Sequence, residues 1–226
     1  MENQNLFKWK HYQPDIVLLT VRWYLRYHLS FRDLVEMMEE RGLSMAHTTI
    51  MRWIHQYSPE FRRHLKSTND SWRVDETYIK VKGQWMYLYR AVDSEGSTID
   101  FYLSKTRDHK AAKHFFKKAL RSFHVSKPRV ITVDKNPAYP IAIEELRKEK
   151  NMPSGMQLRQ KKYLNNIMEQ DHRFIKKRVR SMLELKSFRT ANYILSGIEA
   201  MHMIKKKQVH QGVNKEFIDK LFGIVS

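Results

Sequence analysis

Residues 72–92, WRVDETYIKVKGQWMYLYRAV, decide the fold, because they read as two strands joined by a tight turn. The segment 72–82 is predicted to be a strand, Gly83 and Gln84 supply the turn, and 85–92 is predicted to be a second, buried strand. A third strand is predicted at 98–103, after a turn that contains Gly96. Strands joined by such short turns form an antiparallel meander. The aromatic run at 85–89 is interpreted as core rather than as a platform for stacking bases.

Downstream of the meander, helices and short strands alternate. Helices are predicted at 108–123 and 139–150, short strands at 129–134 and 156–159, a long helix at about 164–185, and further helices at 190–207 and 215–222. Because a helix leads into the apolar strand RVITVD (129–134), this strand is predicted to lie parallel to its neighbour. The order predicts an α+β fold, a mixed sheet with helices on its faces.

Upstream of the meander, the hydrophobic period is helical. The first helix is predicted to start at Pro14 with an apolar face at Ile16, Leu19, Trp23 and Tyr27. The second begins at Ser30, which forms a capping box with Asp33, and it ends near Gly42. The change of period around the polar segment 58–71 predicts a small helical domain at 1–58, a linker at 59–71 and a larger domain at 72–226.

The third helix has an apolar face and a polar face. Its apolar residues are Ile50, Trp53, Ile54 and Tyr57, and Thr48 and Arg52 lie on the opposite side. This pattern predicts a helix-turn-helix, with Thr48 and Arg52 facing DNA. Any three-helix bundle gives similar stripes, so a purely structural role is the alternative.

The charge of the chain favours a nucleic-acid partner. Its 226 residues include 42 Lys and Arg but only 24 Asp and Glu, a net charge of +18. A chain this basic usually binds a polyanion. The absence of cysteine excludes disulfides and thiolate metal sites, and no apolar run reaches the roughly 18–20 residues of a membrane span. We therefore expect a cytoplasmic, nucleoid-associated protein that does not bind membranes.

Three acidic residues stand where a metal site could form. Asp75 lies inside the first strand, Asp134 ends the strand RVITVD, and Glu169 lies early in the long helix. If the two strands are neighbours, Asp75 and Asp134 meet, and the helix can bring Glu169 to them. Carboxylates are the ligands that Mg²⁺ prefers, and two such ions can clamp the attacking and leaving oxygens of a phosphodiester.

Each acid also has an ordinary explanation. Asp134 could cap the next helix, Glu169 could be a surface acid, and Glu76 competes with Asp75. Because successive strand side chains point to opposite faces, only one of Asp75 and Glu76 is expected to face the site. On the long helix, one side carries Glu169, Arg173, Lys176 and Arg180, which suits a metal ligand flanked by phosphate contacts. Asp171 and Arg178 fall among the apolar positions of this helix without explanation.

Several segments together resemble a known family. WRVDETYIKVKGQWMYLYRAVDSEG, VITVDKNPAY, KYLNNIMEQDHRFIKKR and the amino-terminal LRYHLSFRDLVEMMEERGLSMAHTTIMRWIHQY closely resemble the DDE transposases of bacterial insertion sequences, in particular the insertion-sequence-six family. The interval of thirty-four residues between Asp134 and Glu169 fits this family, and Lys176 matches the basic residue that follows the glutamate in many members.

The resemblance implies a fold and an activity. It implies a ribonuclease H-like catalytic domain in which Asp75, Asp134 and Glu169 bind metal, with two Mg²⁺ ions expected and Mn²⁺ as a substitute. The expected partner is double-stranded DNA, both the terminal inverted repeats and the target, and the expected reaction is strand cleavage and transfer of the cointegrate type. A homodimer or higher oligomer is expected on DNA. The alternatives are a helix-turn-helix regulator without catalysis and a ribonuclease H-like nuclease without strand transfer.

Overall fold

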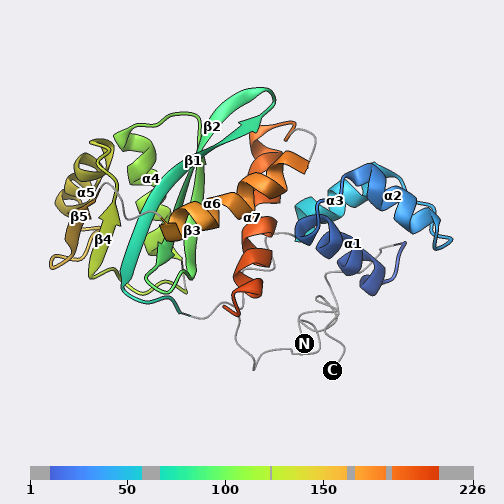
Figure 1. Cartoon of the computed structure of the whole chain (residues 1–226), viewed down its shortest axis with the longest axis horizontal. Helices are drawn as coiled ribbons and strands as arrows, with labels where there is room; N and C mark the ends of the chain where they lie inside the picture. The colour runs from blue at the N-terminus through green and yellow to red at the C-terminus, as the bar shows by residue number, and fades with distance from the viewer. Residues whose placement is uncertain (1–10, 58–66, 123, 162–165, 182–184, 209–226) are drawn as a thin grey trace.

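The computed structural model describes residues 11–57, 67–122, 124–161, 166–181 and 185–208. Within these ranges the chain forms seven helices and five strands (Figure 1). None of these helices is long and apolar enough to cross a membrane.

A five-stranded sheet forms the centre of the fold. Its strands are β1 (Ser71–Val81), β2 (Gln84–Asp93), β3 (Thr98–Ser104), β4 (Val130–Val133) and β5 (Gln157–Gln160), in the order β3-β2-β1-β4-β5. The predicted antiparallel meander is confirmed, and so is the parallel pairing of β4 with β1. The turn between β1 and β2 lies at Lys82 and Gly83, whose φ angles of 49° and 76° are typical of a tight hairpin.

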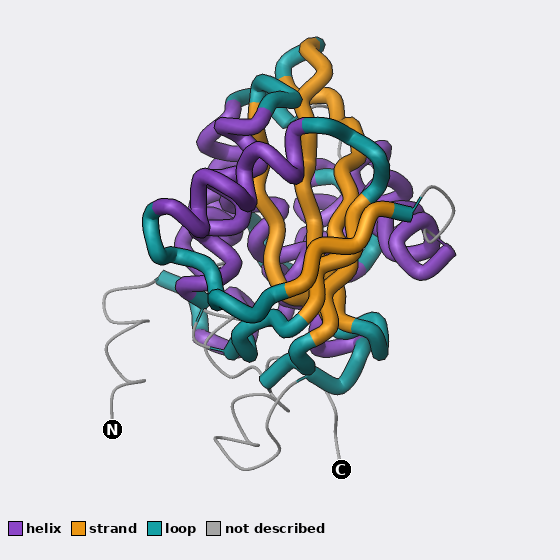
Figure 2. Tube along the Cα trace, turned by 90° about the vertical axis from the view of Figure 1, so that its left-hand side faces the viewer, coloured by secondary structure: helices purple, strands orange, loops and turns teal. Residues whose placement is uncertain are grey.

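Helices cover both faces of the sheet (Figures 1 and 2). One face packs against α4 (His109–Arg121) and α5 (Ala138–Lys148), where Trp72 and Val74 of β1 meet Phe115 and Phe116 of α4 in one hydrophobic cluster. On the other side lie α6 (Asn166–Ser181) and α7 (Phe188–Lys205). The predicted fold class, a mixed sheet with flanking helices, is confirmed.

The amino-terminal helices are α1 (Pro14–Arg26), α2 (Phe31–Glu39) and α3 (His47–Tyr57). The predicted capping box of Ser30 and Asp33 is confirmed at the start of α2. Both α1 and α3 contact α7, and the three helices share a hydrophobic cluster with α7 and with Ile79 and Leu88 of the sheet.

The predicted apolar face of α1 is wrong in detail. Ile16, Leu19 and Trp23 are only half-buried and Tyr27 is exposed, whereas the buried apolar residues are Val17, Leu18, Val21, Tyr24 and Leu25. Apolar residues fill so much of this helix that sequence alone does not single out the face that packs against α3 and α7. The predicted helix at 215–222 lies outside the described residues, and the domain boundaries at 58 and 71 stay predictions.

Candidate active site

Parallel pairing of β4 with β1 places two aspartates side by side at the carboxyl end of β4, in the middle of the sheet. Ser71, Trp72 and Arg73 pair with Val130, Ile131 and Thr132 in turn. Asp134 directly follows β4, so the same register carried two residues further sets it beside Asp75. The sequence-based expectation that these strands are parallel neighbours is therefore confirmed.

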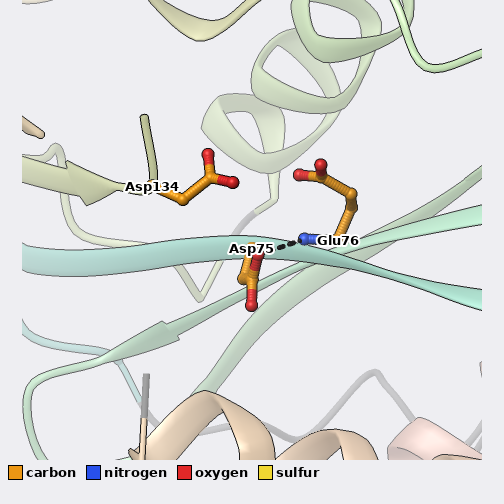
Figure 3. Close-up of side chains that lie close together, drawn as sticks. All are labelled: Asp75, Glu76 and Asp134. Carbon is orange, nitrogen blue, oxygen red and sulfur yellow. Dashed lines mark hydrogen bonds between the residues drawn. The ribbon is translucent and has the colours of Figure 1, made fainter. Parts of the chain in front are cut away.

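Three carboxylates meet at this end of β4. Asp75, Glu76 and Asp134 each offer an oxygen, and these oxygens all lie within 4.8 Å of one another. Figure 3 shows Glu76 and Asp134 on one side of β1, while the Asp75 carboxylate turns to the opposite side, toward α6. The prediction that Asp75 and Glu76 point to opposite faces of β1 is confirmed, although an oxygen of each still lies within 4.8 Å of the other and of Asp134. Because β4 ends at Val133, beside these residues, side chains from both faces of β1 can approach Asp134.

Glu76 is held by three neighbours that sequence reasoning missed. Its side chain is only 2% exposed, and it accepts hydrogen bonds from the Arg107 guanidinium, the Tyr139 hydroxyl and, at 3.1 Å, the Asn136 amide. Arg107 precedes α4, and the other two residues lie around the start of α5. The segment VITVDKNPAY contains both Asn136 and Tyr139, so the motif held a signal for them that periodicity alone did not expose.

Asp134 faces its own turn and Arg107. Its Oδ1 accepts the backbone N–H of Asn136 at 3.0 Å, and its Oδ2 lies 3.8 Å from the Arg107 guanidinium. The residue at the N-cap of α5 is Pro137, so the alternative that Asp134 caps this helix is wrong. Burial, with the negative charge of Glu76 adding to it, raises the pKa of Asp134 above its ordinary value.

The Asp75 side chain is largely buried on the face of β1 that packs against α6. Its side chain is 15% exposed, and its Oδ2 lies 4.0 Å from Nδ1 of His172 on α6. The Glu76 backbone N–H donates to its Oδ1 at 2.9 Å. Burial, followed by the charge of Glu76, raises the pKa of Asp75 to about 7. Burial, followed by the charge of Arg90, lowers the pKa of His172 to about 3, so a neutral imidazole faces Asp75 near neutral pH.

Glu169 lies in the first turn of α6 and is exposed. It is three residues before His172, so it stands about one helical turn from the residue that approaches Asp75. The structure does not bring its carboxylate into the group of three acids. Arg173, Lys176 and Arg180 are exposed with it, as the helix period predicted, while Ile175 is buried.

The oxygen ligands that these three carboxylates offer fit a hard divalent cation. Several carboxylate oxygens close together are the ligands that Mg²⁺ and Mn²⁺ take. Like charges so close also need a cation to compensate them, and the Arg107 guanidinium contacts two of the three acids. The residues are therefore suited to hold metal.

The other predicted binding residues lie on α3. Thr48 and Arg52 are exposed, and Ile50, Trp53, Ile54 and Tyr57 are buried against the rest of the protein. The two faces of this helix are thus assigned as predicted. Contact of Thr48 and Arg52 with DNA stays a prediction.

Comparison with known proteins relates the chain to one enzyme family. Residues 69–208 match a family model of IS240-type transposases described as a DDE domain. The chain is 39% identical, over 207 residues, to a Staphylococcus aureus transposase for the insertion sequence-like element IS431mec, with 90% of both chains covered. Identity and coverage are the same for the S. aureus transposase of insertion sequence element IS257 in transposon Tn4003. A solved HTLV-2 integrase catalytic core domain in complex with magnesium aligns at a TM-score of 0.43 and 19% identity, covering 58% of this chain and 84% of that one.

Proposed function

The chain belongs to the family of DDE transposases of bacterial insertion sequences, and from this premise we propose that it binds the terminal inverted repeats of its own element, exposes a 3′-hydroxyl there and joins it to target DNA. The product we propose is a cointegrate. Because an element has two ends, a homodimer or higher oligomer on DNA would hold both at once.

The carboxylate group at the end of β4 is the observation that carries this proposal. It combines Asp75 and Asp134 on neighbouring parallel strands, inside the segment that matches the DDE domain. A regulator that only binds DNA needs no such group, and crowding acids at 4.8 Å is unfavourable unless a cation compensates them.

We assign the metal ligands to Asp75, Asp134 and Glu169. Two Mg²⁺ ions, or Mn²⁺ in their place, would supply positive charge for the attacking and leaving oxygens of the phosphodiester. Asp75 and Asp134 are held by backbone N–H donors from Glu76 and Asn136, which orient their carboxylates. Glu169 stands in the first turn of α6, three residues before His172, whose Nδ1 lies 4.0 Å from the Asp75 carboxylate. Arg173, Lys176 and Arg180 on the same face would contact DNA phosphates.

Recognition of the element's ends falls to α3 in this proposal. The helix presents Thr48 and Arg52 to solvent, and a second helix of a helix-turn-helix reads bases in the major groove with such residues. An arginine that pairs with guanine would give sequence preference, whereas one on a phosphate would give affinity alone.

The proposal is tested by replacing Glu169 with Gln. The variant keeps the size and helix propensity of the residue, but it removes the charge that a bound cation needs. Cleavage and joining of a labelled terminal repeat in Mg²⁺ should fall about 10³-fold or more, the effect of about 4 kcal/mol in the barrier. Binding of the same DNA should stay equal or become slightly tighter, because an acid leaves a basic face.

The matched control is Glu144→Gln on α5, an exposed acid paired only with Lys148 at 3.2 Å among its described ion pairs. It should cleave and join DNA at the wild-type rate. If Glu169→Gln also joined ends at that rate, Glu169 would be a surface residue. If the wild-type chain bound the repeat but joined nothing in Mg²⁺ or Mn²⁺, the regulator alternative would replace the proposal.

A further inference from the structure

A groove lies between the β1–β2 hairpin and the carboxyl-terminal half of α6, away from the acidic group. It has a volume of about 370 Å³ and is lined by Tyr78, Lys80 and Trp85 from the hairpin and by Lys176, Val179 and Arg180 from α6. Only the first residues of β1 pair with β4, α6 crosses one face of the sheet (Figure 1), and Leu185, which bridges Val81 near the end of β1, also lines the groove. Its volume is at the lower end of the range for small-ligand pockets, about 300–1,000 Å³.

The aromatic side chains of this groove are unusually open to solvent. Trp85 is 68% exposed and Tyr78 is 49% exposed, although the neighbouring Met86 and Leu88 are buried. Among the tryptophans in the described ranges, Trp85 alone is exposed. The interpretation of the run at 85–89 as core is therefore wrong at its first residue, because Trp85 is the second residue of β2 and lies near the hairpin tip. The indole of Trp85 is therefore accessible to a ligand.

The charges around the aromatic pair are all positive. Lys80, Lys176 and Arg180 are exposed, and no acidic side chain is among the described residues that line the groove. Lys80 is the cross-strand neighbour of Trp85, with its Nζ 6.0 Å from the ring centroid. Aromatic faces beside cations are the combination that binds single-stranded nucleic acid, because bases stack on the rings while phosphates meet the cations.

The position of the groove relative to Glu169 indicates which DNA strand it could bind. Lys176 and Arg180 lie on the same exposed face of α6 as Glu169, seven and eleven residues further along. At 1.5 Å per residue these distances are about 10 Å and 16 Å, a span of a few nucleotides. A strand whose phosphate lies beside Glu169 can therefore follow the basic face of α6 into the groove.

We propose that this groove binds an unpaired nucleotide of the DNA strand at the catalytic site, with its base stacked on Trp85 and its phosphates on Lys176 and Arg180. The inference rests on the proposed function for the identity of the strand. It adds a site for unstacked DNA, separate from the acidic group and from α3.

The test measures binding of a fluorescein-labelled oligothymidylate of about ten nucleotides to the full chain, in EDTA and at about 0.3 M salt. High salt weakens phosphate contacts and leaves stacking as the larger contribution. Trp85→Ala should weaken binding about tenfold or more, and Trp85→Phe, which keeps an aromatic face, should weaken it less. Binding should quench tryptophan fluorescence in the wild-type chain, and Trp85→Phe should lose that quenching.

Two controls make the result specific. Ile141→Ala removes another exposed apolar side chain, 47% exposed and on α5, and should bind the oligonucleotide like the wild-type chain. A blunt duplex of the same length should bind Trp85→Ala as it binds the wild-type chain, because paired bases are already stacked on one another.

Equal affinity of Trp85→Ala and the wild-type chain for the single strand would overturn the inference. So would an equal loss for single strand and duplex, since the groove would then contact only the backbone. The assay needs neither metal nor catalysis, so a negative result here leaves the transposase proposal intact. Conversely, loss of binding by Trp85→Ala in a chain that joined no DNA ends would support the groove and remove the proposed function.

Discussion

Asp75 combines burial with two neighbouring carboxylates, and both the burial and these charges raise its pKa. His172 does not relieve this, because its own pKa is lowered to about 3 and its ring is neutral near neutral pH. Metal-free protein therefore holds a carboxylate whose ionised form is unfavourable. A divalent cation at the same place would reverse that preference, which couples metal binding to stability at one residue.

The raised pKa of Asp75 predicts how the stability of metal-free protein depends on pH. The pKa is about 7 in the folded chain and about 3.9 when unfolded, so the folded state binds more protons between these values. The contribution of Asp75 to the free energy of unfolding therefore falls as pH rises through this window. Asp75→Asn should melt higher than the wild-type chain at pH about 8 in EDTA, by at least about 2–4 °C, the shift for 1 kcal/mol.

Thermal melts at several pH values check this prediction. The difference in Tm should shrink as pH falls toward about 4, and Mg²⁺ should raise the Tm of the wild-type chain but not that of the variant. Asn keeps an oxygen that can accept the Glu76 N–H, so packing should be preserved. A difference in Tm that is the same at every pH would show that the pKa of Asp75 is not raised in the folded chain.

At the scale of elements, a buried ion network fixes α6 and α7 against the sheet. Arg90 of β2 is fully buried and donates to Glu199 of α7 at 2.6 and 2.8 Å, while its Nη2 lies 2.6 Å from Asp171 of α6. His202 and Lys206 also contact Asp171. Although burial opposes it, the Arg90 charge holds the pKa of Asp171 below its usual value. The network thus anchors α6 at Asp171, two residues after Glu169.

This network explains why the sequence predicted the elements but not all of their contacts. Periodicity and turn residues predicted each described helix and strand, because those signals are local. Asp171 and Arg178 stood out as charges at apolar positions, yet their partners are distant in sequence. Arg178 lies 5.1 Å from the Tyr24 ring centroid and donates to the Leu25 carbonyl at 3.4 Å. The motif led to Asp75 and Asp134 for the same local reason, whereas the contact of Arg107 with Glu76 became visible only in three dimensions.

Replacing Arg90 with Met should destabilise the chain strongly. The change leaves Asp171 and Glu199 buried without their shared cation, and breaking a buried pair in this way costs about 3–5 kcal/mol. Urea unfolding in EDTA measures the loss. The matched control is Arg129→Met, whose pair with Asp70 is exposed at 66% and 47% and should contribute less than about 1 kcal/mol.

A second variant tests whether the loss in Arg90→Met comes from carboxylates that are left buried without a cation. Arg90→Met combined with Glu199→Leu removes the cation together with one of its two carboxylates, while Asp171 keeps its contacts with Lys206 and His202. This double variant should recover part of the lost stability, because apolar replacements of buried ion groups are often neutral. If Arg90→Met cost no more than Arg129→Met, the network would not be what holds α6 in place.

At the scale of the whole molecule, the amino-terminal helices are not isolated from the catalytic sheet. They share one hydrophobic cluster with α7, and Arg178 links α6 to α1. No sequence signal predicted this packing, because the apolar face of a helix does not show which element it packs against. As a result, the exposed face of α3 and the basic face of α6 are parts of one folded body.

That shared body, with a net charge of +18, predicts a steep salt dependence of DNA binding. If about eight phosphates are contacted, log K should fall with log salt at a slope near −7, a loss of roughly 10⁴-fold between 50 and 200 mM. Replacing Arg173, Lys176 and Arg180 together with Ala should make the slope shallower by about 3, because each phosphate contact contributes about 0.9.

The control for the salt prediction removes basic residues from the other face of the sheet. Lys110 of α4 and Lys148 of α5 are both exposed, and changing both to Ala lowers the net charge without touching α6. If phosphates follow α6, the slope should stay near the wild-type value in this control, since overall charge acts at long range and is screened within about 10 Å at 0.1 M salt. Equal flattening by both sets would mean that DNA is attracted by net charge alone, with no defined path from α3 along α6 to the acidic group.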